Sequence, residues 1–136
     1  MNSRRLAVLA TCPDGFPYTC LVGFAFSEDL KEIYFATFEN TRKFRNITAH
    51  PGVSMLVDSR ENSQSDFGQA KALTILGRAK SARGPEKEKI KISFLRRFPR
   101  LEGFVTDPAC AMVKITPEKY ILVERFQEVT EWEIKS

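Results

Sequence analysis

Three cations crowd into the segment NTRKFRNI, where Arg42, Lys43 and Arg45 open a short run with helical spacing. A helix start carries partial positive charge, so a cation there costs roughly 0.3–1 kcal/mol. A bound anion would reverse this cost, because free backbone N–H groups at a helix start bind phosphate and the cations add charge-assisted hydrogen bonds. Thr37 and Thr41 offer hydroxyls nearby. Residue chemistry alone leaves two interpretations open, a phosphate site and a solvated basic helix.

A phosphate site needs a surface for the rest of its ligand. The run PYTCLVGFAFS is rich in β-branched and aromatic residues, and Gly23 interrupts it after Leu21 and Val22. A glycine inside a strand often lets another group approach the backbone closely, and a flat aromatic ring could hydrogen-bond there. The alternative is a β-bulge, which residue chemistry alone favours.

Most catalytic and metal-binding patterns are absent from the sequence. The chain has one histidine, His50, at the junction between the expected helix and Pro51. A lone histidine there is more often a capping or surface residue, and no Ser-His-acid set can be assembled without it. No cluster of carboxylates and histidine has metal-ligand spacing. No glycine-rich phosphate loop or dinucleotide fingerprint occurs. We therefore expect no metal site.

The composition predicts one ordinary domain covering residues 1–136. The chain is 43% hydrophobic and 28% charged, which suits a packed core, and its net charge of +4 permits an anionic partner without requiring one. The cysteines, Cys12, Cys20 and Cys110, are odd in number, and we expect small buried hydrophobes with reduced thiols. No signal peptide or bilayer-length apolar run is visible, so the sequence predicts a cytoplasmic protein without membrane spans.

Strands dominate the expected secondary structure. Alternation and turn residues predict strands over 5–11, 17–27, 32–37, 53–58, 70–82, 109–116, 119–125 and 129–134, the first three forming a meander. Helices are expected over 41–49, with Asn40 as N-cap, and over 85–98, with Ile90, Phe94 and Phe98 on one face. Gly77 suggests a bulge, and 59–68 an exposed loop. This order predicts a closed or nearly closed antiparallel barrel.

The order of these motifs resembles a known family. The succession PDG, PYTCLVGFAF, EIYFAT, NTRKFRNI, HPGVSMLV and ALTILGRA is similar to the FMN-binding split-barrel proteins related to pyridoxamine 5'-phosphate oxidase. The resemblance runs from about Leu6 to Trp132. The later segments FLRRFP and ACAMVKITPEKYILVERF look most like the haem-utilisation branch. The resemblance implies a mainly β fold, an antiparallel Greek-key split β-barrel with two inserted helices, and a homodimer with FMN at the subunit interface.

The resemblance also implies roles for individual residues. The strand from Leu21 to Phe26, with Val22 and Gly23, would run along the flavin ring. Residues that would hold the ribityl phosphate are Ala36, Thr37, Thr41, Arg42 and Lys43, with Asn46 just after them. Lys71 to Thr74 would approach the flavin from the partner subunit. Arg125, Phe126 and Trp132 match a C-terminal loop and strand near the ring, although Trp132 fits a core or interface anchor equally well.

Departures from the family bear on the reaction. ERFQEVTEWEIKS has no counterpart of the substrate-binding Arg and His of pyridoxamine phosphate oxidases, and Ala72 stands where those enzymes give a Gln to the flavin, which argues against vitamin B6 oxidation. RFQ replaces the glycine-rich loop of haem-degrading members, and only His50 could ligate haem, which argues against haem degradation.

These features predict an FMN-dependent oxidoreductase acting on an unknown small molecule. The alternative is a non-catalytic flavin or haem carrier or sensor. A third hypothesis is a nucleic-acid binder that uses cations from both expected helices: Arg42, Lys43, Arg45, Arg96, Arg97 and Arg100. The aromatic residues are not interleaved with these cations, as stacking platforms would be, which argues against it.

Overall fold

The computed structural model describes residues 6–58, 71–124 and 128–134. Its strands form one antiparallel sheet in the order β2-β1-β5-β6-β7-β4-β3, with β8 paired to β7. The strands are β1 (Leu6–Thr11), β2 (Tyr18–Gly23), β3 (Ala25–Phe26), β4 (Ile33–Phe38), β5 (Gly52–Asp58), β6 (Lys71–Ser81), β7 (Cys110–Glu124) and β8 (Glu128–Glu133). The helices are α1 (Arg42–Ala49), α3 (Gly84–Arg97) and α4 (Glu102–Val105), with a 3-10 turn at Pro99–Leu101. The predicted antiparallel split barrel is confirmed, with three short helices rather than two among the described residues.

The barrel closes where the chain changes partners at Phe24. β2 pairs with β1, whereas β3 pairs with β4, so the two ends of the sheet are joined by one covalent turn. Phe24 is fully buried at this corner. The single strand predicted over 17–27 is therefore wrong in detail, because an aromatic side chain turns into the core and breaks the strand there. Only Ala25 and Phe26 of this segment continue the expected meander toward β4.

The split in the barrel lies along β7. The two strands predicted over 109–116 and 119–125 are one strand, which pairs with β6 along its length. On its other edge it pairs first with β4 and then with β8. The predicted bulge at Gly77 is confirmed, since the register shifts there and a Cβ would lie 2.6 Å from the carbonyl oxygen of Thr116. Pro117, opposite Gly77, is accommodated at this irregularity.

Two apolar clusters stabilise the fold. Inward-facing residues of β1, β2, β4, β5, β6 and β7 fill the barrel. A second cluster lies where α3 and α4 cover β4 and the first half of β7, and it includes Ile90, Phe94 and Met112. Phe98 packs against it, so the predicted apolar face of the long helix is confirmed. The 3-10 turn and α4 were not predicted, because they follow Pro99 in a short segment without clear periodicity.

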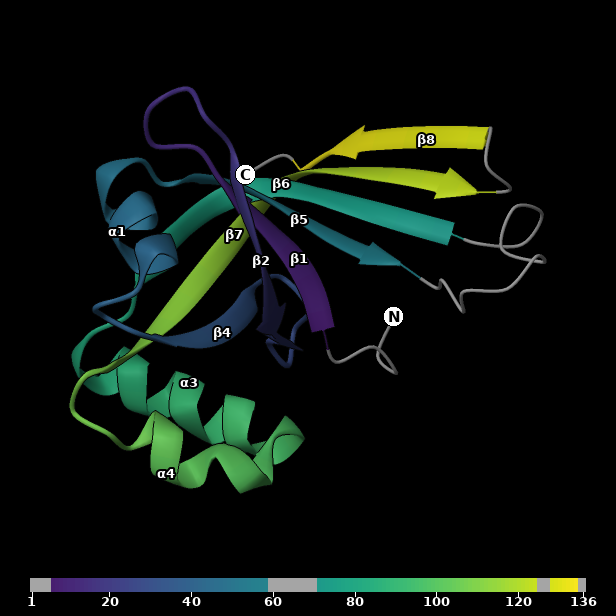
Figure 1. Ribbon diagram of the computed structural model, residues 1–136. Coiled ribbons are helices and arrows are strands. Elements are labelled where there is room, and N and C mark those ends of the chain that lie inside the picture. The colour runs from purple at the N-terminus through teal and green to yellow at the C-terminus, as the bar shows by residue number, and fades with distance from the viewer. Residues whose placement is uncertain (1–5, 59–70, 125–127, 135–136) are drawn as a thin grey trace.

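Figure 1 shows that the helices occupy separate places. α1 lies at one end of the barrel beside the β1–β2 connection, whereas α3 and α4 lie together at the side of β4. β6, the end of β7 and β8 extend away from α1. None of the described helices has the length and apolar character needed to cross a membrane.

Candidate functional site

The first turn of α1 is shaped by two threonines. Thr41, not the predicted Asn40, is the N-cap, and its Oγ1 accepts the backbone N–H of Phe44 at 3.3 Å. The Oγ1 atoms of Thr37 and Thr41 lie 2.9 Å apart, and Thr41 donates to the carbonyl of Phe38 at 3.0 Å. Asn40 instead uses its carbonyl to accept from Nη1 of Arg45 at 2.9 Å. Both predicted hydroxyls therefore lie at the helix start, where they fix its geometry.

The two cations of this turn stand without anionic partners. The first turn contains no acidic residue, and neither Arg42 nor Lys43 forms an ion pair within the described residues. The backbone N–H groups of these two residues likewise have no acceptor within the part of the chain described. Free N–H groups and adjacent cations at a helix start are the donor set that binds a phosphate. The residues present thus fit the phosphate of FMN.

The β1–β2 end of the barrel contacts α1 directly. The guanidinium carbon of Arg42 lies 5.0 Å from the centroid of the Tyr18 ring, within the range of a cation–π contact. Burial raises the pKa of the Cys20 thiol above its ordinary value, and the nearby charge of Lys43 offsets part of this rise. Sequence reasoning did not select Tyr18 or Cys20. The sequence showed only that both residues belong to a strand that precedes the cationic segment, and this does not indicate that they contact α1.

Asn46 is buried on the inner side of α1. Its Nδ2 donates to Oγ1 of Thr11 at 2.9 Å, and both residues are almost completely buried. This side chain therefore joins the helix to the end of β1. Its predicted role as a cofactor ligand stays a prediction, and the contact that the structure provides is with Thr11, which sequence reasoning did not select.

The other predicted ring-binding residues are divided by strand alternation. Leu21, 67% exposed, and the half-buried Gly23 lie on the outer face of the sheet. Val22 points into the barrel core. Ala36 packs against the cluster under α3, so its side chain faces away from the barrel interior. Leu21 and Gly23 are thus the members of this set that could meet a ligand through an exposed surface.

The predicted partner-subunit residues do not join the α1 site within one chain. Lys71 forms an ion pair with Glu124 at 3.4 Å. Thr74 is half-buried in β6, directly opposite Leu56 and Ile121. Trp132 stacks on Tyr120 with ring centroids 5.3 Å apart, in the β7–β8 part that extends away from α1 (Figure 1). Arg125 and Phe126 lie outside the described residues, as does the whole of the exposed loop predicted over 59–68.

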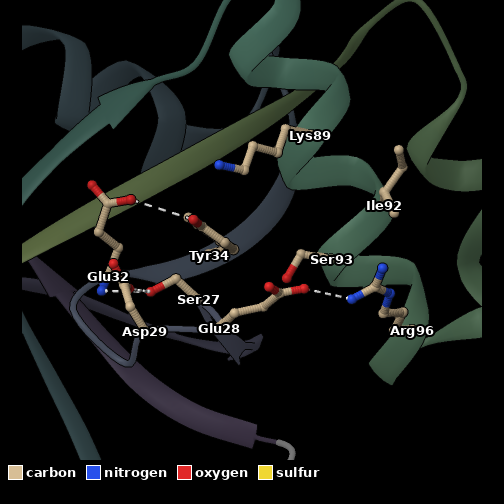
Figure 2. Close-up of a pocket in the computed structure, with 9 residues that line it drawn as sticks. All are labelled: Ser27, Glu28, Asp29, Glu32, Tyr34, Lys89, Ile92, Ser93 and Arg96. Atoms are coloured by element: carbon tan, nitrogen blue, oxygen red, sulfur yellow. Dashed lines mark hydrogen bonds and ion pairs between the residues drawn. The ribbon is translucent and has the colours of Figure 1, made fainter.

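A separate cavity of about 450 Å³ lies between the β3–β4 turn and α3 (Figure 2). Ser27, Glu28, Asp29, Glu32 and Tyr34 form one side, and Lys89, Ile92, Ser93 and Arg96 line the helix side. The four helix residues are separated by three, one and three positions, a spacing that places them on one face of α3. Sequence reasoning did not use this signal. Arg96, one of the cations of the nucleic-acid hypothesis, lines this cavity, but none of the predicted cofactor-binding residues does.

Most charged groups of the cavity are already paired. Arg96 contacts Glu28 at 2.6 Å, and the Tyr34 hydroxyl donates to Glu32 at 3.3 Å. Burial, and then the charge of Glu32, raise the pKa of Tyr34, whereas a hydrogen bond from Ser27 lowers the pKa of Asp29. The ion pair of Arg96 with Glu28 joins the turn to α3. The unpaired cations at α1 therefore form the better candidate for an anion site.

Comparison with known proteins agrees with the sequence pattern. A family model described as pyridoxamine 5'-phosphate oxidase matches residues 1–124. The chain belongs to this family. No protein of curated function matches the sequence. Within the described ranges, no group of three or more His, Cys, Asp and Glu is arranged to hold a metal ion.

Solved structures of the same fold carry several functional descriptions. A heme binding protein from Mycobacterium smegmatis superimposes with a TM-score of 0.85 at 14% identity, over 96% of this chain and 53% of that one. ChuZ from Campylobacter jejuni gives 0.81 at 19% identity, over 96% and 55%. A FAD-binding protein from Mesorhizobium loti gives 0.71 at 19% identity, over 89% and 84%. The chain thus spans about half the length of the first two, and at these identities the likeness shows the fold alone.

Proposed function

We propose that this protein binds FMN, with the flavin phosphate at the start of α1. The observation that carries the proposal is the pair Arg42 and Lys43, which lie beside free N–H groups and have no acidic partner within the described residues. Thr37 and Thr41 hold the turn in shape through their 2.9 Å contact. Arg42 would supply planar guanidinium donors, and Lys43 a compact point charge.

The flavin ring would lie against the exposed edge of β2. Tyr18 and Leu21 are three residues apart in β2, so Leu21 lies roughly 10 Å along the strand from the Arg42 contact and on the opposite face of the strand. Leu21 offers apolar surface, and Gly23 leaves backbone accessible. These positions support a ligand that is anionic at one end and flat and apolar at the other.

We further propose that the protein is a homodimer through its outer sheet face. A row of paired residues crosses five strands on this face, Leu21, Val8, Leu56, Thr74 and Ile121, and all are exposed or half-buried. A contiguous apolar face of this kind is typical of an interface. A partner copy would also bring Lys71 and Thr74 of its own β6 toward the flavin, because within one chain they lie away from α1.

The assembly proposal has a direct test. Leu56→Arg places a charge at the middle of the row, and we expect it to convert the dimer into a monomer by light scattering coupled to gel filtration. Lys89→Glu, on the exposed side of α3 away from this face, serves as a charge-changing control. An unmodified protein that is already monomeric, or a Leu56→Arg protein that stays dimeric, would contradict this interface.

A flavin or haem carrier or sensor is the reading that the comparisons favour. Structural neighbours are described as heme binding and FAD-binding. An FMN-dependent oxidoreductase is the second candidate, supported by the oxidase description of the family. In that case bound FMN would supply the redox chemistry, and the chain would bind and orient it and exclude water.

The visible spectrum of the purified protein tests flavin binding. We expect a flavin spectrum, or a flavin spectrum after added FMN, that survives gel filtration. A colourless protein that fails to retain FMN would contradict the proposal. A Soret band on titration with haem would then favour a haem-binding protein. Rapid bleaching of bound flavin by NAD(P)H, with turnover, would support the oxidoreductase, whereas no reduction by either nicotinamide supports the carrier.

A further inference from the structure

Two contacts join α1 to the same rung of the β1–β2 ladder. Thr11 and Tyr18 are directly opposite each other in this ladder. Asn46 of α1 donates to the Thr11 hydroxyl, and Arg42, one helical turn earlier, places its guanidinium over the Tyr18 ring. Residues four apart lie on the same side of a helix. One side of α1 therefore contacts both members of the Thr11–Tyr18 pair, one through a hydrogen bond and the other through a cation–π contact.

The two contacts differ in strength and exposure. The Asn46–Thr11 hydrogen bond is 2.9 Å long and buried, and the loss of its acceptor would leave an amide unpaired in the core. The Tyr18–Arg42 contact lies near the surface, because Arg42 is exposed. The Thr11 hydroxyl also lies 3.5 Å from the carbonyl of Tyr18, a distance too long to add much. The buried bond fixes the helix, and the ring then limits where Arg42 can point.

We propose that Thr11 and Tyr18 are positioning residues of the phosphate site. Thr11 sets the placement of α1 through Asn46, and Tyr18 holds the Arg42 guanidinium between the helix start and β2. Neither residue needs to contact the ligand. This inference rests on the proposed function for its ligand, but the positions of the two contacts are independent of any ligand.

Tyr18 is tested with ring-removing and ring-preserving variants. We expect Tyr18→Leu to weaken FMN binding about two- to five-fold, the range that corresponds to a cation–π contact near the surface, and to leave riboflavin binding unchanged. Tyr18→Phe keeps the ring and should bind FMN like the unmodified protein. Phe16→Leu is a matched control, because Phe16 is an aromatic residue of the same connection, 81% exposed. Calorimetric titration with both ligands gives the comparison.

Thr11 is tested by rescue. We expect Thr11→Val to weaken FMN binding more than riboflavin binding, because α1 and its cations lose their anchor. Thr11→Ser keeps the hydroxyl and should restore the FMN affinity to within about two-fold of the unmodified protein. Equal losses for the Ser and Val variants, or equal losses for FMN and riboflavin, would overturn the positioning role of Thr11.

A ligand-free measurement separates this inference from the proposed function. The δ-methylene protons of Arg42 should show a ring-current shift in the unmodified protein and in Tyr18→Phe, and lose it in Tyr18→Leu. An unchanged shift in Tyr18→Leu overturns the positioning role even if FMN binds. If the unmodified protein binds no FMN, the proposed function fails. Titration with inorganic phosphate then decides the positioning role, which requires weaker phosphate binding in Tyr18→Leu than in Tyr18→Phe.

Discussion

The start of α1 and the cavity beside α3 both contain several cations, but the cations beside α3 are mostly paired with carboxylates and those of the first turn of α1 are not. Beside α3, Arg96 meets Glu28 at 2.6 Å, and Lys114 meets Glu86 at 2.7 Å. At α1, Arg42 and Lys43 meet no carboxylate within the described residues. Lys89 of the cavity forms no ion pair with any residue that the structure describes, yet carboxylates lie across the same space.

The difference teaches how a charge pattern indicates a site. Charges that neutralise one another at a surface contribute about 0–1 kcal/mol and join two elements of the fold. Cations that oppose a helix dipole without a partner cost stability, and a bound anion would recover that cost. The cavity beside α3 is therefore not the better anion site. The pairing of the charges distinguishes the two regions.

The largest expected effect comes from the core under α3. Phe94 is 2% exposed, and Phe94→Ala should lower the free energy of unfolding by about 3–5 kcal/mol. If the two regions are independent, the folded variant should bind FMN as the unmodified protein does. Chemical denaturation and calorimetry measure the two quantities. Phe94→Leu offers a milder variant if the alanine form does not fold, and a loss of FMN affinity in the folded protein would show that the regions are coupled.

The next effect is a loss of phosphate recognition at α1. Arg42→Ala with Lys43→Ala should weaken FMN binding about 100-fold, because two charge-assisted hydrogen bonds are removed, and leave riboflavin binding almost unchanged. The matched control is Lys89→Ala with Arg96→Ala, which removes two cations from the α3 cavity. Calorimetric titration of both double variants provides the test. Equal FMN losses in the two variants would refute the distinction between the regions.

The smallest effect concerns the ion pairs beside α3. The hydrogen bond with Lys114 lowers the pKa of Glu86 below its ordinary value of 4.5, and the same bond raises the pKa of Lys114. The pair thus stabilises the fold at neutral pH. The contribution of Glu86 is lost as the pH falls through its lowered pKa, and that of Lys114 is lost as the pH rises through its raised one.

Glu86→Gln should therefore lower stability by less than about 1 kcal/mol at pH 7, since the carboxylate is exposed and screened by solvent. The difference from the unmodified protein should disappear at acid pH. Thermal unfolding across pH measures it, with Glu133→Gln as a control carboxylate that has no ion pair among the described residues. A difference that does not shrink as the pH falls from 7 into the acid range would mean that the pair is not its source.

Local patterns predicted the elements better than their partners. The cations of α1, the apolar face of α3 and the bulge at Gly77 each follow from a short stretch of sequence, and all three lie where expected. The N-cap was misplaced by one residue, because Asn40 and Thr41 are both good caps and only the contact with Thr37 selects Thr41. The break at Phe24 was missed, because a partner exchange leaves no signature in strand propensity.

The candidate site was predicted in part for the same reason. Thr37, Thr41, Arg42 and Lys43 are close in the chain, so the short turn from β4 into α1 brings them together. Val22 and Ala36 were placed with the ligand, but strand alternation and the second core turn their side chains elsewhere. The predicted roles of Val22 and Ala36 in cofactor binding stay predictions.

The sequence by itself determined a β-rich chain of one family, with a cationic helix start, because these features depend on residue types and near-neighbour spacing. The tertiary structure decided which strands exchange partners at Phe24, and that Thr11 and Tyr18 meet Asn46 and Arg42. Those contacts join residues that are far apart in sequence. Only the closure of the barrel, which buries apolar side chains from six strands and α1, brings them within reach.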